Sequence, residues 1–435
     1  MSLIPCGRVN AQNDMTIIRD TEIENTLHEW SSPIFKAAGL DPAAVKIILV
    51  QNDQINAFVA GGSNIFFYTG LIAKAQNPGE VIGVIAHETG HIAGGHLIRS
   101  REAMERASYE SMIGALLGIG AAIATGDPGA VGAIAAGGGS MAARRYLAHS
   151  RVQESSADQA ALSFLEKAHM DPSGLLSFME TLKSDMYVPY DQQSEYVQTH
   201  PLVENRIDAL RLRVNQSPYK GKGFPAAWNE ELARIKAKLV GFTDPGQVQW
   251  LYNDRDHSIA ADYARAIAAY RMNKVSDSLS RMDALLAKEP QNPYFLELKG
   301  QMLADFGKGK EAIPYYKKAI EILPDAALIR IALGHTMIES GNGASDLREA
   351  IKQLERALTE EPRASEVHRF LATAYGRLGD VNMATVHLAE EAVLQRRFPY
   401  AREQAQSVLK NAPKDSKAWI MAQDVLSFID SVEKG

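Results

Sequence analysis

Five residues, His87 to His91, constrain the fold of this chain more than any other part of its 435-residue sequence. Residues four apart on an α-helix lie on the same face, so the His87 and His91 imidazoles can reach one tetrahedral ion. Glu88 would lie beside that ion, where a carboxylate can take a proton from a water that zinc has made acidic. An apolar run over 81–86 and the start signal Asn77-Pro78-Gly79-Glu80 also indicate a helix. The pattern predicts the zinc helix of a metallopeptidase, provided that the chain supplies a third ligand.

Two known arrangements supply a third ligand, and they predict different positions. In the metzincin arrangement a histidine follows six residues after the second one, but that position is Leu97 and the nearby histidine is His96. One residue of misregister turns a side chain by about 100° around a helix. The other arrangement uses a carboxylate from a second helix, and Glu154 and Asp158 share one face of a predicted helix over 150–161. We expect Glu154 to bind the metal and Asp158 to accept the free N–H of a ligating histidine.

Further segments, in the same order along the chain, resemble the gluzincin metallopeptidases of the HtpX and CAAX prenyl protease type. They are Asn56-Ala57-Phe58, Tyr68-Thr69-Gly70-Leu71, the Ser-Arg-x-x-Glu-x-x-Ala-Asp segment at 150–158, and Thr199-His200-Pro201 followed by Arg206. The resemblance covers residues 20–212. It implies a zinc endopeptidase that acts on envelope proteins, sometimes with a chaperone-like role. One zinc per chain would be held by His87, His91 and Glu154.

His200 and Arg206 are candidates for the catalytic machinery. Pro201 fixes a turn that can aim the His200 imidazole, and the resemblance places such a histidine at the metal. Two active roles remain open. His200 would enter the open fourth position on zinc and silence the enzyme, or His200 or Arg206 would donate to the oxyanion that forms as water attacks. An ordinary surface turn is the third interpretation.

The residues before the metal helix predict a helix over 21–38, a buried strand over 45–50 and a hairpin of strands over 55–59 and 65–68. The hairpin has either a free edge that pairs with an extended substrate or an ordinary place in the core. Asn56, Ala57 and Phe58 are the possible substrate strand. We expect an α+β, zincin-like and mainly helical metallopeptidase domain with a small β-sheet over residues 20–212.

Residues 112–143 contain one charge, Asp127, and consist largely of Gly and Ala. Asp127-Pro128-Gly129 divides the segment into two apolar pieces, neither of which reaches the about 18–20 residues needed to span a bilayer. Three interpretations remain: a lid near the active-site cleft, a peripheral membrane contact, or an oligomer contact.

A 34-residue period follows a predicted linker and connecting helix at 213–257, as Gly300 and Gly334 illustrate. Small and aromatic residues fall on the positions of a tetratricopeptide repeat. We therefore expect residues 258–435 to form an all-α tetratricopeptide-repeat solenoid. Its concave surface would bind a peptide or a partner protein.

The N-terminal segment over 1–19 is interpreted as a signal-peptide remnant with a flexible N-terminus. Val9-Asn10-Ala11 has the form of a small-x-Ala cleavage site, so we expect an exported, periplasmic protein whose mature chain begins near Gln12. The single cysteine, Cys6, excludes an intramolecular disulfide and a cysteine-rich metal site. A net charge of −6, with 46% hydrophobic and 23% charged residues, is typical of a globular chain and argues against nucleic-acid binding.

Together these features predict an exported zinc endopeptidase that hydrolyses peptide bonds of misfolded or unassembled envelope proteins. The repeat domain would dock the substrate or a partner protein. The alternative function is an envelope-protein chaperone or assembly factor whose metal site is latent and whose repeats do the main work.

Overall fold

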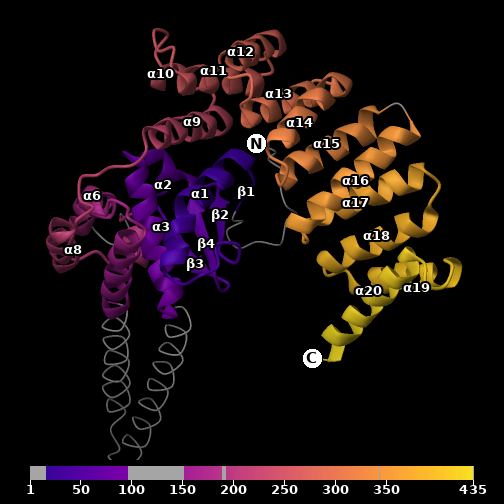
Figure 1. Cartoon of the computed structure of the whole chain (residues 1–435), viewed down its shortest axis with the longest axis horizontal. Coiled ribbons are helices and arrows are strands. Elements are labelled where there is room, and N and C mark those ends of the chain that lie inside the picture. The colour runs from indigo at the N-terminus through magenta and orange to yellow at the C-terminus, as the bar shows by residue number, and fades with distance from the viewer. Residues whose placement is uncertain (1–15, 97–150, 189–192, 342, 435) are drawn as a thin grey trace, which may run out of the picture. The chain divides into compact units, whose positions relative to one another are not determined.

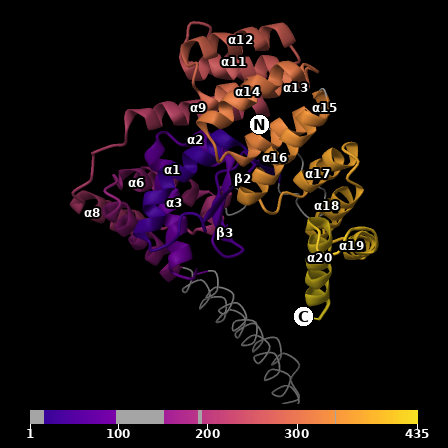
Figure 2. The same cartoon turned by 45° about the vertical axis from the view of Figure 1, so that its right-hand side comes forward.

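The computed structural model describes four stretches of the chain, residues 16–96, 151–188, 193–341 and 343–434. They divide into two compact units, with the boundary in sequence between Leu239 and Val240. Figures 1 and 2 show the elements of each unit in two views. The predicted segment at 112–143 and the expected cleavage site lie outside the described residues. In the part of the chain that the structure describes, no helix is both long and apolar enough to cross a membrane.

A four-stranded sheet in the order β1-β2-β4-β3 lies in the first unit. Its strands are β1 (Ile17–Ile18), β2 (Lys46–Val50), β3 (Ala57–Ala60) and β4 (Asn64–Tyr68). β2 and β4 are parallel, whereas the outer strands β1 and β3 run antiparallel to their neighbours. The predicted hairpin is therefore confirmed, and β3 forms one edge of the sheet. The ordered chain includes β1, earlier than the predicted end of the flexible N-terminus at residue 19, because Ile18 is buried against the core.

One face of this sheet is part of the protein core. Ile18, Leu49, Phe67 and Ala57 form a row across all four strands, and each is at most 1% exposed. Helices α1 (Thr21–Ala37) and α3 (Pro78–Ala93) contact the sheet and each other. The other helical parts of this unit are α2 (Thr69–Lys74), residues 151–167, α6 (Ser173–Thr181), the 3-10 helix η1 (Leu182–Tyr187), α7 (Glu195–Thr199), α8 (Glu204–Gln216) and most of α9 (Ala226–Thr243).

Helix α3 begins and ends where its sequence signals place the ends. The Asn77 side chain accepts a hydrogen bond from the Glu80 N–H, Pro78 occupies the first turn, and Gly94 follows the last residue. Every residue from Pro78 to Gly90 is buried. A helix that is buried on all sides is typical of the interior of a domain. The predicted metal helix thus holds His87 and Glu88 away from water, whereas His91 is partly exposed.

The helix over 151–167 approaches α3 very closely at Gly90. A Cβ atom at Gly90 would lie 2.7 Å from the carbonyl oxygen of Ala157. Real Cβ atoms do not approach an oxygen so closely, so only glycine allows this spacing. Ala157 lies between Glu154 and Asp158, and Gly90 directly precedes His91. The close approach therefore brings the two sets of predicted site residues to the same place.

Helix α9 is anchored to the start of α1 by a buried ion cluster. The Lys238 Nζ lies 2.8 Å from the Asp20 carboxylate and 3.3 Å from the Glu22 carboxylate, and all three side chains are at most 2% exposed. Asp20 also caps α1. Removing one partner of such a cluster leaves a buried charge uncompensated, which is strongly destabilising.

Helical hairpins make up the second unit, as predicted. After α10 (Val248–Leu251) they are α11 (Ile259–Arg271) with α12 (Val275–Lys288), α13 (Pro293–Asp305) with α14 (Gly309–Ile322), α15 (Ala327–Ser340) with α16 (Ala344–Glu360), α17 (Ser365–Arg377) with α18 (Val381–Leu394), and α19 (Phe398–Asn411) with α20 (Lys417–Lys434). Gly300 packs on the Tyr316 ring, and Gly334 packs on Leu354 in the equivalent place one repeat later. Both predicted classes, the α+β domain and the all-α repeats, are confirmed.

Candidate metal centre

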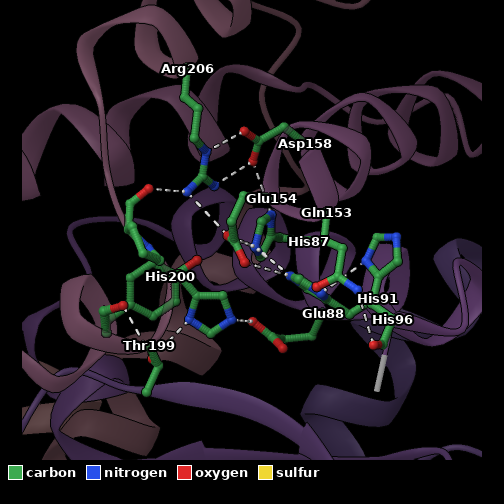
Figure 3. Close-up of polar contacts among 12 residues, drawn as sticks. His87, Glu88, His91, His96, Gln153, Glu154, Asp158, Thr199, His200 and Arg206 are labelled. Carbon is green, nitrogen blue, oxygen red and sulfur yellow. Dashed lines mark hydrogen bonds and ion pairs between the residues drawn. The ribbon is translucent and has the colours of Figure 1, made fainter. Parts of the chain in front are cut away.

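Four side chains converge in the interior of the first unit. His87 and His91 come from α3, Glu154 from the helix over 151–167, and His200 follows α7 (Figure 3). One ligand atom from each lies within 4.8 Å of the others. His87, Glu154 and His200 are at most 6% exposed. Within the described residues, the structure thus brings together the three predicted ligands and a third histidine, His200, which the sequence also indicated.

The spacing of the donor atoms fits one tetrahedral ion. The His87 and His91 Nε2 atoms are 3.1 Å apart. Glu154 oxygens lie 3.4 Å from the His87 Nε2 and 3.5 Å from the His91 Nε2. Ligands about 2.0–2.1 Å from a tetrahedral zinc lie about 3.3–3.4 Å from one another. Two imidazoles and a carboxylate are also a set of donors typical of catalytic zinc.

The Nδ1 atom of each of the two candidate histidine ligands has a polar contact that orients its ring. The His87 Nδ1 lies 3.0 Å from the Asp158 carboxylate, so this nitrogen carries the hydrogen and Nε2 is left for the metal. The His91 Nδ1 lies 3.1 Å from the His96 Nδ1. His96 can fold back onto His91 because Gly94 leaves room, since a Cβ there would lie 2.4 Å from the His96 ring. Sequence reasoning considered His96 only as a ligand and missed this orienting contact.

Glu88 has the environment of a proton carrier. Its side chain is 0% exposed, and neither carboxylate oxygen has a hydrogen-bond partner among the described residues. The His200 Nε2 lies 3.5 Å from one of these oxygens. Burial raises the pKa of Glu88 to about 8. A carboxyl group that titrates near neutral pH can both accept and return a proton.

Arg206 binds the carboxylates of Glu154 and Asp158 on the helix over 151–167. It makes a two-pronged contact with Asp158, at 2.7 and 2.9 Å, and a contact of 3.1 Å with Glu154. A further bond of 2.9 Å goes to the carbonyl oxygen of Pro201, next to His200. Although burial opposes ionisation, the contacts with Arg206 and His87 lower the pKa of Asp158. Since most of its N–H groups are engaged, Arg206 is suited to positioning the site residues more than to binding an oxyanion.

His200 is held at the site by several contacts. Its ring stacks on Tyr196 with centroids 4.7 Å apart, and its Nδ1 lies 3.0 Å from the Thr199 hydroxyl. Nε2 is thereby left facing the metal cluster. Burial lowers the pKa of His200 to about 4, so the imidazole is neutral at physiological pH. A neutral nitrogen with a free lone pair is able to ligate a metal.

Charge balance gives an independent indication of a divalent cation. The three buried carboxylates of Glu88, Glu154 and Asp158 surround one buried guanidinium, that of Arg206. Two negative charges are left, which is the charge that one zinc ion would neutralise. Without a metal, protons take that place: burial opposes the charge on His87, but the hydrogen bonds that it donates to Asp158 and Glu154 raise its pKa to about 10. Glu88 holds a second proton near neutral pH, because burial raises its pKa to about 8.

The edge strand of the sheet is connected to the His200 segment. The Ile55 carbonyl, just before β3, accepts a hydrogen bond of 3.0 Å from the Tyr196 N–H. The Asn56 side chain contacts Glu195 and Thr199, both at 3.3 Å. Asn56, from the predicted substrate strand, thus serves as a bridge to α7. Ala57 and Phe58 lie on β3 itself.

Comparisons with known proteins agree with this description. Residues 19–214 match Peptidase family M48, and residues 263–327 and 343–382 match a tetratricopeptide repeat. The beta-barrel assembly-enhancing protease of Escherichia coli (strain K12) is 28% identical over 385 residues, which cover 86% of this chain and 75% of that protein. The metalloprotease YcaL of the same organism is 28% identical over 190 residues, 42% of this chain and 67% of YcaL. A solved structure of MamA (AMB-1) aligns with 38% of this chain and 98% of its own length, at 21% identity and a TM-score of 0.34.

Metal binding should displace protons from this site. At pH 7 the metal-free protein holds one proton on His87, with a pKa of about 10, and one on Glu88, with a pKa of about 8. The His87 proton must leave because a ligand binds in its deprotonated form, and the charge of the cation lowers the pKa of the neighbouring Glu88 so that its proton leaves as well. We expect about two protons to be released per zinc by the wild type and about one by a Glu88→Gln variant. Calorimetric titration in buffers of different ionisation enthalpy measures both numbers.

The affinity of the Glu88→Gln variant for zinc should also rise about tenfold per pH unit between pH 6 and 8, because a single proton competes with the metal. Competition with a chelator of known protonation measures this slope. An affinity that does not change over this range would mean that His87 is already neutral in the metal-free protein.

Proposed function

Because residues 19–214 are a Peptidase family M48 domain and tetratricopeptide repeats follow it, we propose that this metalloprotease hydrolyses peptide bonds with one zinc ion. The ligands would be the Nε2 atoms of His87 and His91 and the carboxylate of Glu154. The homology to the beta-barrel assembly-enhancing protease extends over 86% of the chain. The metalloprotease with repeats that the sequence predicts is therefore confirmed, and the zinc and its ligands are the proposal.

The single observation that carries the zinc proposal is the spacing of the three donor atoms. Each of the three separations lies between 3.1 and 3.5 Å. Asp158 and His96 hold the two imidazoles so that both Nε2 lone pairs face the Glu154 carboxylate. Such outer contacts tune the affinity of a metal site by roughly 10–100-fold. The centre is thus built with two layers of residues.

In the proposed reaction Glu88 moves the protons. Zinc bound at this site would supply Lewis acidity, which lowers the pKa of a water to about 7 and polarises the scissile carbonyl. Glu88 takes one proton from the attacking water and returns it to the nitrogen of the leaving amine. Arg206 keeps Glu154 and Asp158 ionised and in place throughout.

Two substitutions separate metal binding from catalysis. Glu154→Ala removes a ligand, so the purified protein should lose its zinc together with its activity. Glu88→Gln keeps the shape and the ligands but removes the base, so about one zinc per chain should remain while hydrolysis of an unfolded protein is lost. Metal analysis and a peptidase assay measure the two properties. A wild-type protein without zinc after purification in zinc-containing buffer would contradict the proposal.

His200 is proposed to act as a latch on the metal. Its Nε2 belongs to the group of donor atoms within 4.8 Å of one another. The Thr199 hydroxyl donates to the Glu195 carbonyl, so it can accept from the His200 Nδ1, and that tautomer leaves Nε2 free of hydrogen. A fourth protein ligand would occupy the position that the attacking water needs. The contact of Arg206 with the Pro201 carbonyl helps to hold His200 inward.

The sign of a kinetic effect distinguishes the two roles of His200. If His200 is a latch, His200→Ala should raise the rate of peptide hydrolysis several-fold at constant zinc content. If His200 donates to the oxyanion, the same change should lower the rate by roughly 10²–10³-fold. An unchanged rate with unchanged zinc would eliminate both roles. Hydrolysis of a short unstructured peptide is the appropriate assay.

The free edge of β3 is proposed to hold the substrate as an extended strand. The Tyr68 N–H donates to the Asn56 carbonyl. In an antiparallel pair, alternate residues point their backbone groups toward and away from the partner. Ala57 and Val59 therefore direct their N–H and C=O groups away from β4; Ala57 is buried, whereas Val59 is partly exposed at the free edge. An added strand can be bound there through its backbone with little demand on its sequence.

The substrate class follows from the homology. The related protein from Escherichia coli is named as a protease that enhances β-barrel assembly. We accordingly assign misfolded or unassembled envelope proteins to this enzyme as substrates, and the periplasm as its compartment. The repeats would dock the substrate or a partner protein on their concave surface.

Deleting the repeats tests this division of work. Removal of residues 258–435 should spare the cleavage of a short peptide, because every proposed ligand precedes residue 207. Processing of an unassembled envelope protein should fall. Parallel assays on the two substrates compare the effects. An equal loss on both would mean that the repeats are needed for the stability of the catalytic unit.

The alternative function, a chaperone or assembly factor with a latent metal site, leads to a different result for Glu88→Gln. Such a protein would keep its full effect on envelope-protein assembly when the base is removed. The buried position of Glu88 favours the peptidase, since a carboxyl without a hydrogen-bond partner in the described region is costly unless it has a function.

A further inference from the structure

The hydroxyl group of Tyr196 is buried beside the candidate metal centre, without a hydrogen-bond partner among the described residues. The residue is 1% exposed, and no described group donates to or accepts from its oxygen. More than about 90% of buried polar groups in folded proteins have a partner, and an exception requires an explanation. A phenylalanine would fill the same space without leaving a hydroxyl unsatisfied.

Three contacts hold the Tyr196 ring in one position. It stacks on His200, with centroids 4.7 Å apart and an angle of 23° between the planes. Tyr196 and Phe178 pack edge to face, with ring centroids 5.1 Å apart and an angle of 89° between the planes. The backbone N–H donates to the Ile55 carbonyl just before the edge strand. A side chain fixed in this way presents its hydroxyl at a defined point.

The residues near Tyr196 are those proposed to bind the metal and to move protons. Burial and the negative charges of Glu88 and Glu154 raise the pKa of Tyr196 well above its usual range, whereas the charge of Arg206 opposes this shift. The His87 and Tyr196 ring centroids are 6.5 Å apart. The phenol thus stays protonated and lies among the groups that would bind the metal and move the protons.

We propose that Tyr196 is a further catalytic residue, whose hydroxyl donates a hydrogen bond to the scissile carbonyl oxygen as that oxygen gains negative charge. The inference rests on the proposed peptidase function. Neither other candidate is well placed for this donation, because Arg206 is engaged by Asp158, Glu154 and Pro201. His200, as a latch, has to leave before substrate enters.

The attack of water on the scissile carbonyl does not require a proton from Tyr196. The water oxygen bonds to the carbonyl carbon, the water proton passes to Glu88, and the carbonyl π electrons move to the carbonyl oxygen. The Tyr196 hydrogen stays on its own oxygen and stabilises the new charge. Because His200 is stacked on the ring, the same movement that frees the metal also uncovers Tyr196.

Tyr196→Phe removes only the hydroxyl and tests this role. We expect kcat for a short peptide to fall by roughly 10²–10³-fold, with KM and zinc content nearly unchanged. Affinity for a phosphinic peptide, which mimics the tetrahedral intermediate, should fall by a similar factor, while binding of the unreactive substrate peptide to the Glu88→Gln form should not change. The loss should persist in a His200→Ala background, where no latch remains.

Thermal unfolding separates a catalytic role from a structural one. The Tyr196 hydroxyl has no partner to lose, so Tyr196→Phe should leave the unfolding midpoint unchanged or raise it. Tyr316→Phe is a matched control in the repeats, since Tyr316 is 2% exposed and its hydroxyl bonds to Thr336. This control should unfold at a lower temperature with unchanged hydrolysis of the short peptide.

Three results have distinct meanings. An active wild type with an equally active Tyr196→Phe form overturns the role of Tyr196 and leaves the peptidase function intact. A fall in activity that is matched by a lower unfolding midpoint or by lost zinc also overturns it, in favour of a structural role. A zinc-loaded wild type and His200→Ala form that both fail to cleave peptides overturn the proposed peptidase function as well.

Discussion

The metal centre depends on one steric contact, the approach of Gly90 on α3 to Ala157 on the helix over 151–167. A Cβ at Gly90 would be 2.7 Å from the Ala157 carbonyl oxygen, so any other residue would push the helices apart. The ligands lie directly beside this contact on both helices. A shift of one ångström would change each distance between the histidines and Glu154, and metal geometry tolerates only about 0.2 Å.

Charge is the second constraint on the same small volume. Burying carboxylates is expensive unless cations neutralise them. Arg206 compensates for part of the charge, and its guanidinium matches the geometry of Asp158, with two bonds to the same carboxylate. The remaining charge is that of a divalent ion or of two protons. The same groups therefore explain why the fold tolerates a buried acidic cluster and why that cluster has an affinity for metal.

The contacts of Tyr196 connect three features that lie far apart in the sequence. Its N–H binds the segment before the edge strand, its ring stacks on His200, and the ring centroid lies 6.5 Å from that of His87. A substrate strand that pairs with β3 would thus lie next to the element that holds the latch. Binding of an extended chain at β3 would therefore occur in direct contact with the segment that has to move for the proposed metal site to open.

The sequence by itself determined the features that arise from spacing within one element. The Asn77 cap and the apolar run specify α3, the four-residue spacing places His87 with His91 and Glu154 with Asp158, and the period of 34 specifies the repeats. Only the tertiary structure decided which residues meet between elements. His96 orients His91, Arg206 binds both acids, and Tyr196 stacks on His200. The physical reason is that a helix fixes directions among its own side chains, whereas distances between helices depend on packing at contacts such as Gly90 on Ala157.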